Sequence, residues 1–160
     1  MQATTDLDLT PLGAAANDPL WQQEPALLPL ALEAAAVRLR AYAPYSGFLV
    51  GAALRSTAGT VLCGCNVENA SYPVGQCAER SAIGIAVSQG LRQFDVVVIV
   101  TDAPEPAAPC GLCRQTLAEF GLHLRVVLVS LQGKVWHAPL SDLLPHAFGP
   151  GSFEVKRSRD

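Results

Sequence analysis

The sequence has few charged residues and lacks any cluster of basic ones. Its 160 residues include 11 Lys or Arg and 14 Asp or Glu, which gives a formal net charge of −3. A protein that binds long nucleic acid usually carries an electropositive stripe that neutralises phosphate groups. The scattered basic residues argue against such a stripe, and we therefore expect no nucleic-acid partner.

A long apolar run and a leader segment are also missing. No stretch approaches the roughly 20 apolar residues that a membrane-spanning helix needs, so we expect no membrane segment. Residues 1–6 form neither a basic nor an apolar segment of the signal-peptide type. The number of cysteines, five, is odd, which disfavours a disulfide framework. We therefore expect a cytoplasmic protein with reduced thiols.

Apolar residues are plentiful by contrast, at 50% of the chain. A chain of this length and composition can bury one good core and is too short for two. We expect a flexible N-terminal extension at residues 1–26, in which Trp21 docks on the core or lies at a subunit contact. The single domain is predicted to span residues 27–153, followed by a flexible tail at residues 154–160.

Hydrophobic patterning within the domain predicts alternating helices and strands. The expected strands cover residues 48–54, 60–67, 94–100, 124–129 and 135–137, and the expected helices cover residues 27–43, 77–89, 110–120 and 141–147. One face of the first helix is predicted to pack on the sheet, namely Leu28, Leu32, Ala35, Ala36 and Leu39. This order predicts an α/β fold: a three-layer α-β-α sandwich with a central mixed five-stranded sheet.

Three of the cysteines occur in two short motifs, the first of which also contains an acid. Residues 77–79 read Cys-Ala-Glu, and residues 109–113 read Pro-Cys-Gly-Leu-Cys. Cys110 and Cys113 lie three residues apart at the start of an expected helix, so one metal ion can contact both sulfurs. Three protein ligands on zinc leave a fourth position for water, which distinguishes a catalytic site from a closed structural one. We therefore predict one Zn²⁺ held by Cys77, Cys110 and Cys113.

Glu79 is the predicted general acid and base of this site. In a regular helix, Cys77 and Glu79 point roughly 200° apart at about 100° per residue, so Glu79 should not bind the metal. A carboxylate beside a metal ion can instead move protons to and from the reacting water. Helix N-termini lower the pKa of thiols, and Arg80 and Gln115 are predicted to donate hydrogen bonds to the ligand sulfurs.

The residues alone leave two other interpretations open. The thiols could be buried free cysteines, which are common in protein cores. Alternatively, Cys65 could be a fourth ligand, which would make the domain a non-catalytic structural zinc module and leave Glu79 without a purpose. The three histidines, His123, His137 and His146, lie outside the motifs, and we expect them to be solvated or hydrogen-bonded in the core.

Five motifs in a constant order make the sequence resemble the cytidine deaminases, specifically the small enzymes that act on free nucleosides. The resemblance covers residues 27–153. Its motifs are Tyr42-Ala43-Pro44-Tyr45-Ser46-x-Phe48-x-Val50-Gly51-Ala52-Ala53, Cys65-Asn66-Val67-Glu68-Asn69-Ala70-Ser71-Tyr72, Cys77-Ala78-Glu79-Arg80, Pro109-Cys110-Gly111-x-Cys113-Arg114-Gln115 and Leu143-Leu144-Pro145-x-x-Phe148-Gly149-Pro150.

The resemblance implies a reaction. Cytidine and 2'-deoxycytidine would be hydrolysed at C4 of the base to uridine and 2'-deoxyuridine, with release of ammonia, as in pyrimidine salvage. Glu79 would carry one proton to N3 and a second to the departing amine. The nearest alternative within the same chemistry is a deaminase of another cytosine-containing small substrate or of a polynucleotide.

The resemblance also implies which residues contact the substrate. Asn66 and Glu68 would hold the ribose hydroxyls, because an amide and a carboxylate can donate to and accept from a diol. Phe48 would stack on the base, and the main chain of Ala78 would contact the pyrimidine edge. Phe148 would reach the pocket of a neighbouring subunit in the homotetramer that is typical of these enzymes.

Overall fold

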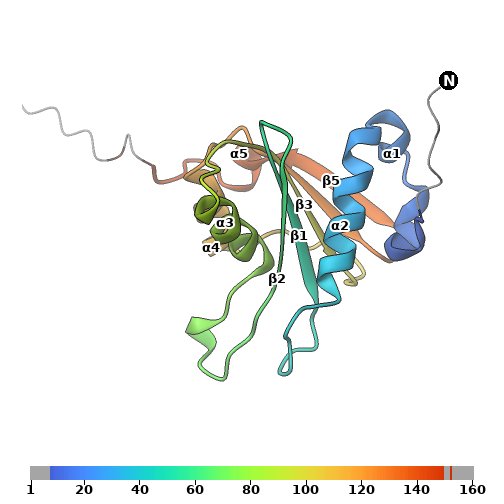
Figure 1. Ribbon diagram of the computed structural model, residues 1–160, viewed down its shortest axis with the longest axis horizontal. Helices are drawn as coiled ribbons and strands as arrows, with labels where there is room; N and C mark the ends of the chain where they lie inside the picture. Colours follow the sequence, from blue (N-terminus) through green and yellow to red (C-terminus); the bar gives the residue numbers. More distant parts are fainter. Residues whose placement is uncertain (1–7, 150–151, 153–160) are drawn as a thin grey trace, which may run out of the picture.

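The computed structural model describes residues 8–149 and residue 152, and its centre is one mixed sheet (Figure 1). The five strands lie in the order β2-β1-β3-β4-β5. Strands β3 and β4 run parallel, and the other neighbouring pairs run antiparallel. The strand bounds are Val50–Ser56 (β1), Val61–Cys65 (β2), Phe94–Thr101 (β3), Arg125–Ser130 (β4) and Lys134–Pro139 (β5).

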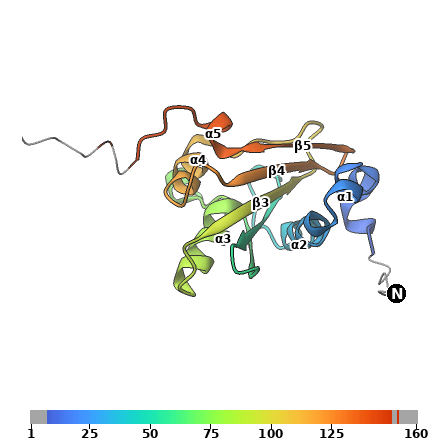
Figure 2. The same cartoon turned by 90° about the horizontal axis from the view of Figure 1, so that it is seen from above.

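Helices cover both faces of this sheet, as Figures 1 and 2 show. On one face lie α1 (Leu20–Gln23) and α2 (Leu28–Arg38), and on the other lie α3 (Ala78–Ser88) and α4 (Gly111–Ala118). The short helix α5 (Leu140–Leu143) follows β5 and contacts α4. The predicted three-layer α-β-α sandwich with a mixed five-stranded sheet is therefore confirmed. Every helix in the described part of the chain is too short or too polar to cross a lipid bilayer.

Strand β3 is the centre of the molecule and is buried on both faces. Val96, Val98 and Val100 belong to the core under α2, whereas Val97 and Ile99 belong to the core under α3 and α4. A continuous run of β-branched residues is typical of such a strand, because both faces are covered by helices.

The buried face of α2 differs from the predicted one. The buried residues of this helix are Leu30, Ala31, Ala34, Ala35 and Arg38. Leu39, which was expected to pack inward, is 72% exposed and follows the end of the helix. The prediction is confirmed for Ala35, which is buried, and for Leu28 and Leu32, which pack against the core. It is wrong for Ala36 and Leu39, which are exposed, because Ala and Leu occur all around this helix and apolar periodicity does not select one face. Packing against the sheet selects the buried face. The contact between α2 and β1 is so close that a Cβ on Gly51 of β1 would lie 1.9 Å from the carbonyl oxygen of Ala34.

Residues 10–27 pack against the sheet, whereas the sequence predicted a flexible extension at residues 1–26. Two 3₁₀ helices, Thr10–Asn17 and Pro25–Leu27, flank α1. The side chains that join the core under α2 are those of Leu12, Ala15, Leu20, Trp21 and Leu27. The segment has too few periodic apolar residues to be predicted as an element, but these few are enough to bury it. Residues 1–7 and all of the expected tail, 154–160, lie outside the described residues.

Polar contacts fix this N-terminal segment in place. The indole Nε1 of Trp21 donates to the carbonyl oxygen of Ala15 at 2.7 Å, and the predicted docking of Trp21 on the core is confirmed. The guanidinium of Arg125 on β4 forms an ion pair with Glu24, with one hydrogen bond of 2.7 Å to Oε1. The segment is therefore joined to the sheet by both apolar and charged contacts.

Candidate metal and catalytic site

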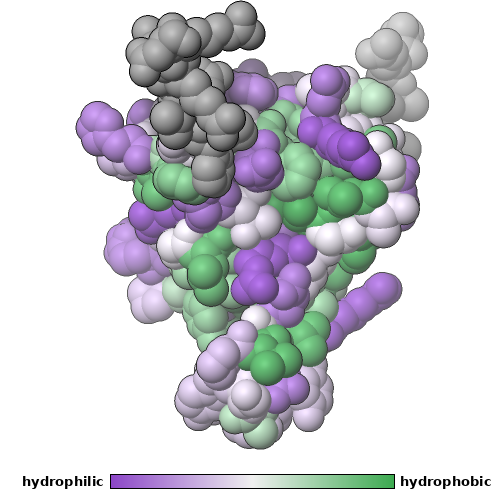
Figure 3. Space-filling model, turned by 90° about the vertical axis from the view of Figure 1, so that its left-hand side faces the viewer, coloured by the Kyte–Doolittle hydropathy of each residue, from purple (hydrophilic) through white to green (hydrophobic). Residues whose placement is uncertain are grey.

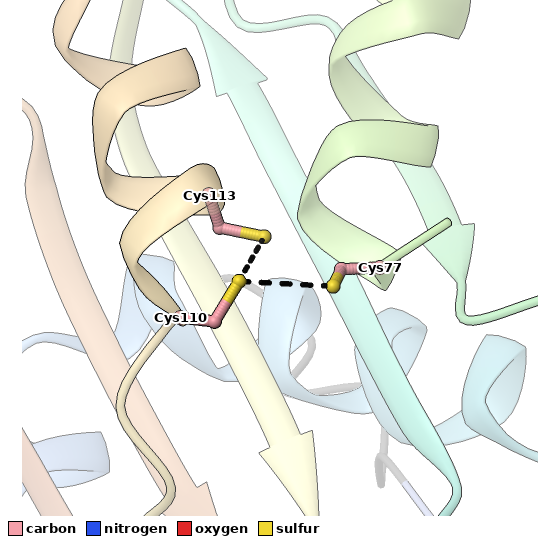
Figure 4. A group of neighbouring side chains, drawn as sticks. All are labelled: Cys77, Cys110 and Cys113. Carbon is pink, nitrogen blue, oxygen red and sulfur yellow. Dashed lines mark hydrogen bonds between the residues drawn. The ribbon is translucent and has the colours of Figure 1, made fainter. Parts of the chain in front are cut away.

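Two helix starts on the same face of the sheet carry the three predicted sulfur ligands. Cys77 directly precedes α3 and Cys110 directly precedes α4, and both have extended backbone conformations, with ψ angles of 155° and 170°. Their carbonyl oxygens accept the first helical hydrogen bonds, from Ser81 and Arg114. Cys113 lies in the first turn of α4. Because the two helices lie on one face, their starts bring the three thiols together (Figure 4).

The spacing of the sulfurs fits a single zinc ion. The Sγ atom of Cys110 lies 3.9 Å from that of Cys77 and 3.6 Å from that of Cys113, and all three lie within 4.8 Å of one another. Zinc–sulfur bonds of about 2.3 Å at tetrahedral angles separate two sulfurs by about 3.8 Å. Among the described residues this is the one such cluster that could hold a metal ion. Cys65 is not in it, so the interpretation as a four-cysteine structural site is wrong.

The pKa shifts of the thiols also favour the binding of a cation at this site. A hydrogen bond from Cys113 is the main cause that lowers the pKa of Cys77 to about 6. A hydrogen bond with Cys110 and the positive charge of Arg80 lower this pKa further, whereas burial raises it. The hydrogen bond between Cys77 and Cys113, together with burial, raises the pKa of Cys113. The shared hydrogen bond therefore stabilises the thiolate form of Cys77 and the protonated form of Cys113. Three thiolates at this distance would repel one another, and a divalent ion that accepts thiolate ligands removes that repulsion.

Glu79 lies beside the sulfurs and is almost completely buried, with 4% of its surface exposed. Burial raises the pKa of its carboxyl group, and the negative charge of Cys77 raises the pKa further. A carboxylate with a raised pKa can both accept and hold a proton, which is what a general acid and base requires. Glu79 is not in the metal-binding cluster, which agrees with its predicted position beside the metal.

A cavity of about 200 Å³ joins Glu79 to the sulfurs and to several predicted substrate-binding residues. The predicted residues that line it are Phe48, Asn66, Cys77, Ala78, Glu79 and Cys110. A larger cavity of about 630 Å³ lies along β5 beside Trp136 and Lys134. We place the candidate site in the smaller cavity, because only that one contains both the sulfurs and the buried acid.

Asn66 uses its amide group to fix the start of β1. Its Oδ1 accepts a hydrogen bond from the backbone N–H of Val50 at 2.8 Å, and its Nδ2 donates to the carbonyl oxygen of Phe48 at 2.8 Å. These two bonds hold Phe48 at the mouth of the cavity, where its side chain is 38% exposed. Asn66 therefore positions another residue of the site.

Glu68 lies in a different cavity from Glu79. Its carboxylate accepts hydrogen bonds from the backbone N–H groups of Tyr45 and Ser46, at 2.9 and 3.2 Å, and from the Ser46 hydroxyl. With Tyr45, Ser46 and Tyr72 it lines a cavity of about 390 Å³. These bonds, that of the Ser46 hydroxyl first, lower the pKa of Glu68. Within one chain, Asn66 and Glu68 do not face the same cavity.

The two residues predicted to support the sulfurs take different positions. Arg80 acts on the sulfurs through its charge, which lowers the pKa of Cys77. Gln115 instead donates from Nε2 to the carbonyl oxygen of Phe148 at 2.9 Å. Phe148 is 58% exposed. Gln115 thus fixes the segment that carries Phe148.

Two residues that support or line the site were not among those predicted from the sequence. Arg114 donates to the carbonyl oxygens of Pro109 and Leu143, at 2.7 and 2.9 Å, and so holds the loop before Cys110. Thr101 is 1% exposed and lines the cavity with Glu79. A usable signal existed for Thr101, because ligands of open α/β sheets bind at the carboxyl ends of the strands and Thr101 ends β3.

The fold and the site together define a class of protein. An α/β domain with three thiols at two helix starts and a buried, non-ligating glutamate beside them is the arrangement of the zinc deaminases, in which the acid is followed downstream by Pro-Cys-x-x-Cys. Comparison with known families identifies the class further. The model of the cytidine and deoxycytidylate deaminase zinc-binding region matches residues 27–130, and the chain belongs to this family.

Individual relatives agree with this assignment. The chain is 45% identical over 120 residues to the cytidine deaminase of Sporosarcina psychrophila, which covers 74% of this chain and 88% of that protein. It is 46% identical over 117 residues to the cytidine deaminase of Halalkalibacterium halodurans, covering 72% of this chain and 89% of the relative. The crystal structure of cytidine deaminase from Burkholderia pseudomallei superimposes with a TM-score of 0.73 at 49% identity, over 75% of this chain and 97% of that one.

Proposed function

We propose that this protein catalyses the hydrolytic deamination of cytidine and 2'-deoxycytidine, with one zinc ion per subunit held by Cys77, Cys110 and Cys113. The observation that carries the proposal is that the buried carboxylate of Glu79 opens into the same cavity as the sulfurs. A cavity with a metal site and a proton carrier has the two components that hydrolysis of an amino-pyrimidine needs. The family of the chain and the names of its relatives support this choice of substrate.

The reaction adds water to C4 of the base and breaks the bond between C4 and the exocyclic nitrogen. Zinc, when bound, supplies the Lewis acidity that lowers the pKa of water. The Glu79 carboxylate accepts a proton from the attacking water and delivers it to N3. It then takes a second proton from the hydroxyl group now attached to C4 and carries it to the exocyclic nitrogen, which leaves as ammonia while that hydroxyl becomes the C4 carbonyl. The burial that raises the pKa of Glu79 lets this side chain hold the proton between the two steps.

The nucleoside is positioned by residues that line the catalytic cavity and by Glu68. Phe48 stacks on the base, and the main chain of Ala78 at the start of α3 contacts the pyrimidine edge. Asn66 binds a ribose hydroxyl, and Glu68, which lines a separate cavity of about 390 Å³, binds another. Arg80 balances the negative charge of the sulfurs, which supports the low pKa of Cys77.

The same proposal includes a homotetramer in the cytoplasm. Large apolar side chains stay exposed in the isolated subunit, with Tyr72 at 77%, Leu112 at 68% and Phe148 at 58% exposure. The face that carries α3 and α4 mixes hydrophobic and hydrophilic residues (Figure 3). Exposed aromatic and aliphatic side chains of this kind favour burial by another subunit, and Phe148 would reach a neighbour's cavity. Thiolate ligands suit a reducing compartment.

Metal content measured together with turnover tests the proposal directly. The purified protein is assayed with cytidine, deoxycytidine, CMP, adenosine and a cytosine-bearing oligonucleotide, and the absorbance change of the base is followed. We expect one zinc per chain and turnover of cytidine and deoxycytidine only. Turnover of the oligonucleotide alone, or turnover of cytidine by protein that contains no metal, would contradict the proposal.

A further inference from the structure

The hydroxyl group of Thr101 is buried and has no hydrogen-bond partner in the described part of the chain. The residue is 1% exposed, so water outside the protein does not reach it. A buried hydroxyl without a partner costs stability, and such groups in native proteins are usually satisfied by a bound water or a ligand. The structure therefore leaves one hydrogen-bonding position to be filled at Thr101.

Ser130, the residue that pairs with Thr101 on β4, shows that a buried hydroxyl at this end of the sheet can have hydrogen-bond partners. Thr101 and Ser130 pair in the parallel register of β3 and β4, and both are almost completely buried. The Ser130 hydroxyl donates to the carbonyl oxygen of Ala103 and accepts from the backbone N–H of Gln132 at 3.1 Å. The two hydroxyls, on paired residues at the ends of neighbouring strands, therefore differ in their hydrogen bonding. Only that of Ser130 is satisfied by the protein.

Thr101 differs from Ser130 in lining the cavity. Both side chains point to the same side of the sheet, towards α3 and α4, because Ile99 and Leu128, two residues earlier on the same strands, both belong to the core on that side. Ile99 and Thr101 both line the cavity that contains Glu79. The unsatisfied hydroxyl therefore lies at the wall of the candidate catalytic cavity, close to where the proposed substrate is bound.

We propose that Thr101 is a substrate-binding residue whose hydroxyl forms a hydrogen bond with the polar edge of the bound pyrimidine. This inference rests on the proposed function, because it assigns the hydroxyl to the base of that substrate. The hydroxyl has no hydrogen bond within the described residues that binding would have to break, so the bond contributes to binding of substrate and product alike. Its loss leaves a polar atom of the bound base unsatisfied, which weakens binding roughly 5- to 100-fold.

The test compares Thr101→Val, which keeps the shape and removes the hydroxyl, with Thr101→Ser, which keeps the hydroxyl. Thr60→Val, in the exposed turn between β1 and β2, is the control for the same change outside the cavity. Four quantities are measured for each zinc-loaded variant: the melting temperature, the dissociation constant of uridine by calorimetry, and the kcat and KM for cytidine. Zinc content is measured in parallel.

We expect Thr101→Val to keep its zinc, to melt at or above the parent temperature, and to bind uridine roughly 5- to 100-fold more weakly, with most of the kinetic effect in KM. Thr101→Ser is expected to stay close to the parent, as is Thr60→Val.

Parent-like uridine binding and KM in Thr101→Val would overturn the inference while leaving the deaminase function intact. A clear fall in its melting temperature would also overturn it, because the hydroxyl would then have an internal partner. Absence of cytidine turnover in the parent would contradict the proposed function, and the melting temperature would still test Thr101.

Discussion

The Sγ atoms of Cys77 and Cys110 lie 3.9 Å apart, although the two residues are separated by 33 positions in the sequence. Each residue stands at the start of its own helix, and the sheet beneath fixes the distance between the two helices. The metal site therefore depends on the packing of α3 and α4 on one face of the sheet. The same packing is expected to depend on the metal, since a structural contact that holds two helix starts also stabilises the fold.

Replacing Cys110 with Ala should remove the zinc and lower the stability together. Two remaining thiols bind the ion too weakly to hold it through purification, and the free energy of unfolding falls because the metal no longer joins the two helices. Elemental analysis and thermal unfolding measure the two effects. The matched control is Cys65→Ala, which changes a cysteine outside the cluster and should keep one zinc per chain. Full zinc occupancy in Cys110→Ala would contradict the ligand assignment.

Replacing Glu79 with Gln should keep the zinc and abolish most of the activity. The amide has nearly the same shape but cannot accept the proton, and a general acid–base group contributes typically about 10²–10⁴-fold to a rate. Because Glu79 acts in two proton transfers, we expect a loss at or beyond the upper end of that range. Single-turnover rates with cytidine measure it, and the exposed Glu119→Gln serves as the control. A zinc-loaded Glu79→Gln protein with near-parent turnover would remove the proposed mechanism.

Gly51→Ala should destabilise the protein, whereas Gly84→Ala should stabilise it slightly. A methyl group on Gly51 would lie 1.9 Å from the Ala34 carbonyl oxygen and force α2 away from β1. Overpacking of this kind costs about 1–3 kcal/mol or more. Gly84 lies on the exposed side of α3, with nothing within 4 Å of the added atom. Alanine is the better helix former there by about 0.5–1 kcal/mol. Urea unfolding of both variants gives the comparison, and equal effects at the two positions would contradict the packing of α2.

Glu24→Gln should make stability less dependent on pH in the acid range. The hydrogen bond from Arg125 is the largest cause that lowers the pKa of Glu24 below its ordinary value of 4.5. The ion pair therefore stabilises the folded protein above pH 4.5, and this contribution is lost as the pH falls through the lowered pKa. The pair is partly exposed, so we expect only about 0.2–1 kcal/mol at neutral pH.

Urea unfolding at neutral pH and at about pH 3 tests the Glu24 prediction. The stability difference between the parent and Glu24→Gln should be largest at neutral pH and smaller at the lower value. Glu119→Gln is again the control and should show no such pattern. A difference that grows as the pH falls would mean that Glu24 is not held by Arg125 in the folded state.

Much of the site could be predicted because the residues that carry its chemistry lie in short segments of the sequence. The spacing of Cys110 and Cys113 predicts that one metal can contact both, and the Cys77-Ala78-Glu79 motif places an acid two residues after a thiol at a helix start. The β-branched run of β3 likewise predicts a strand covered on both faces. These inferences needed only local geometry, so they did not depend on how the elements pack.

Other features required the packed structure. Glu68 follows Asn66 by two residues, yet the loop that contains Ser46 draws Glu68 into a separate cavity. Gln115 lies two residues after a ligand but donates to Phe148 instead of a sulfur. The direction of a polar side chain depends on which donors and acceptors come near it, and here they belong to segments 22 to 33 residues away.

The sequence by itself determined the kinds of element, the three thiols and the acid, because residue type, spacing and periodicity act over a few residues. The tertiary structure decided which face of α2 is buried, that residues 10–27 join the core, and that the hydroxyl of Thr101 is left unsatisfied at the cavity wall. Each of these depends on contacts between residues far apart in the chain. The sequence gives the type of each side chain but not its neighbours. Folding brings distant residues into contact, and these contacts decide whether a side chain is buried and what it binds.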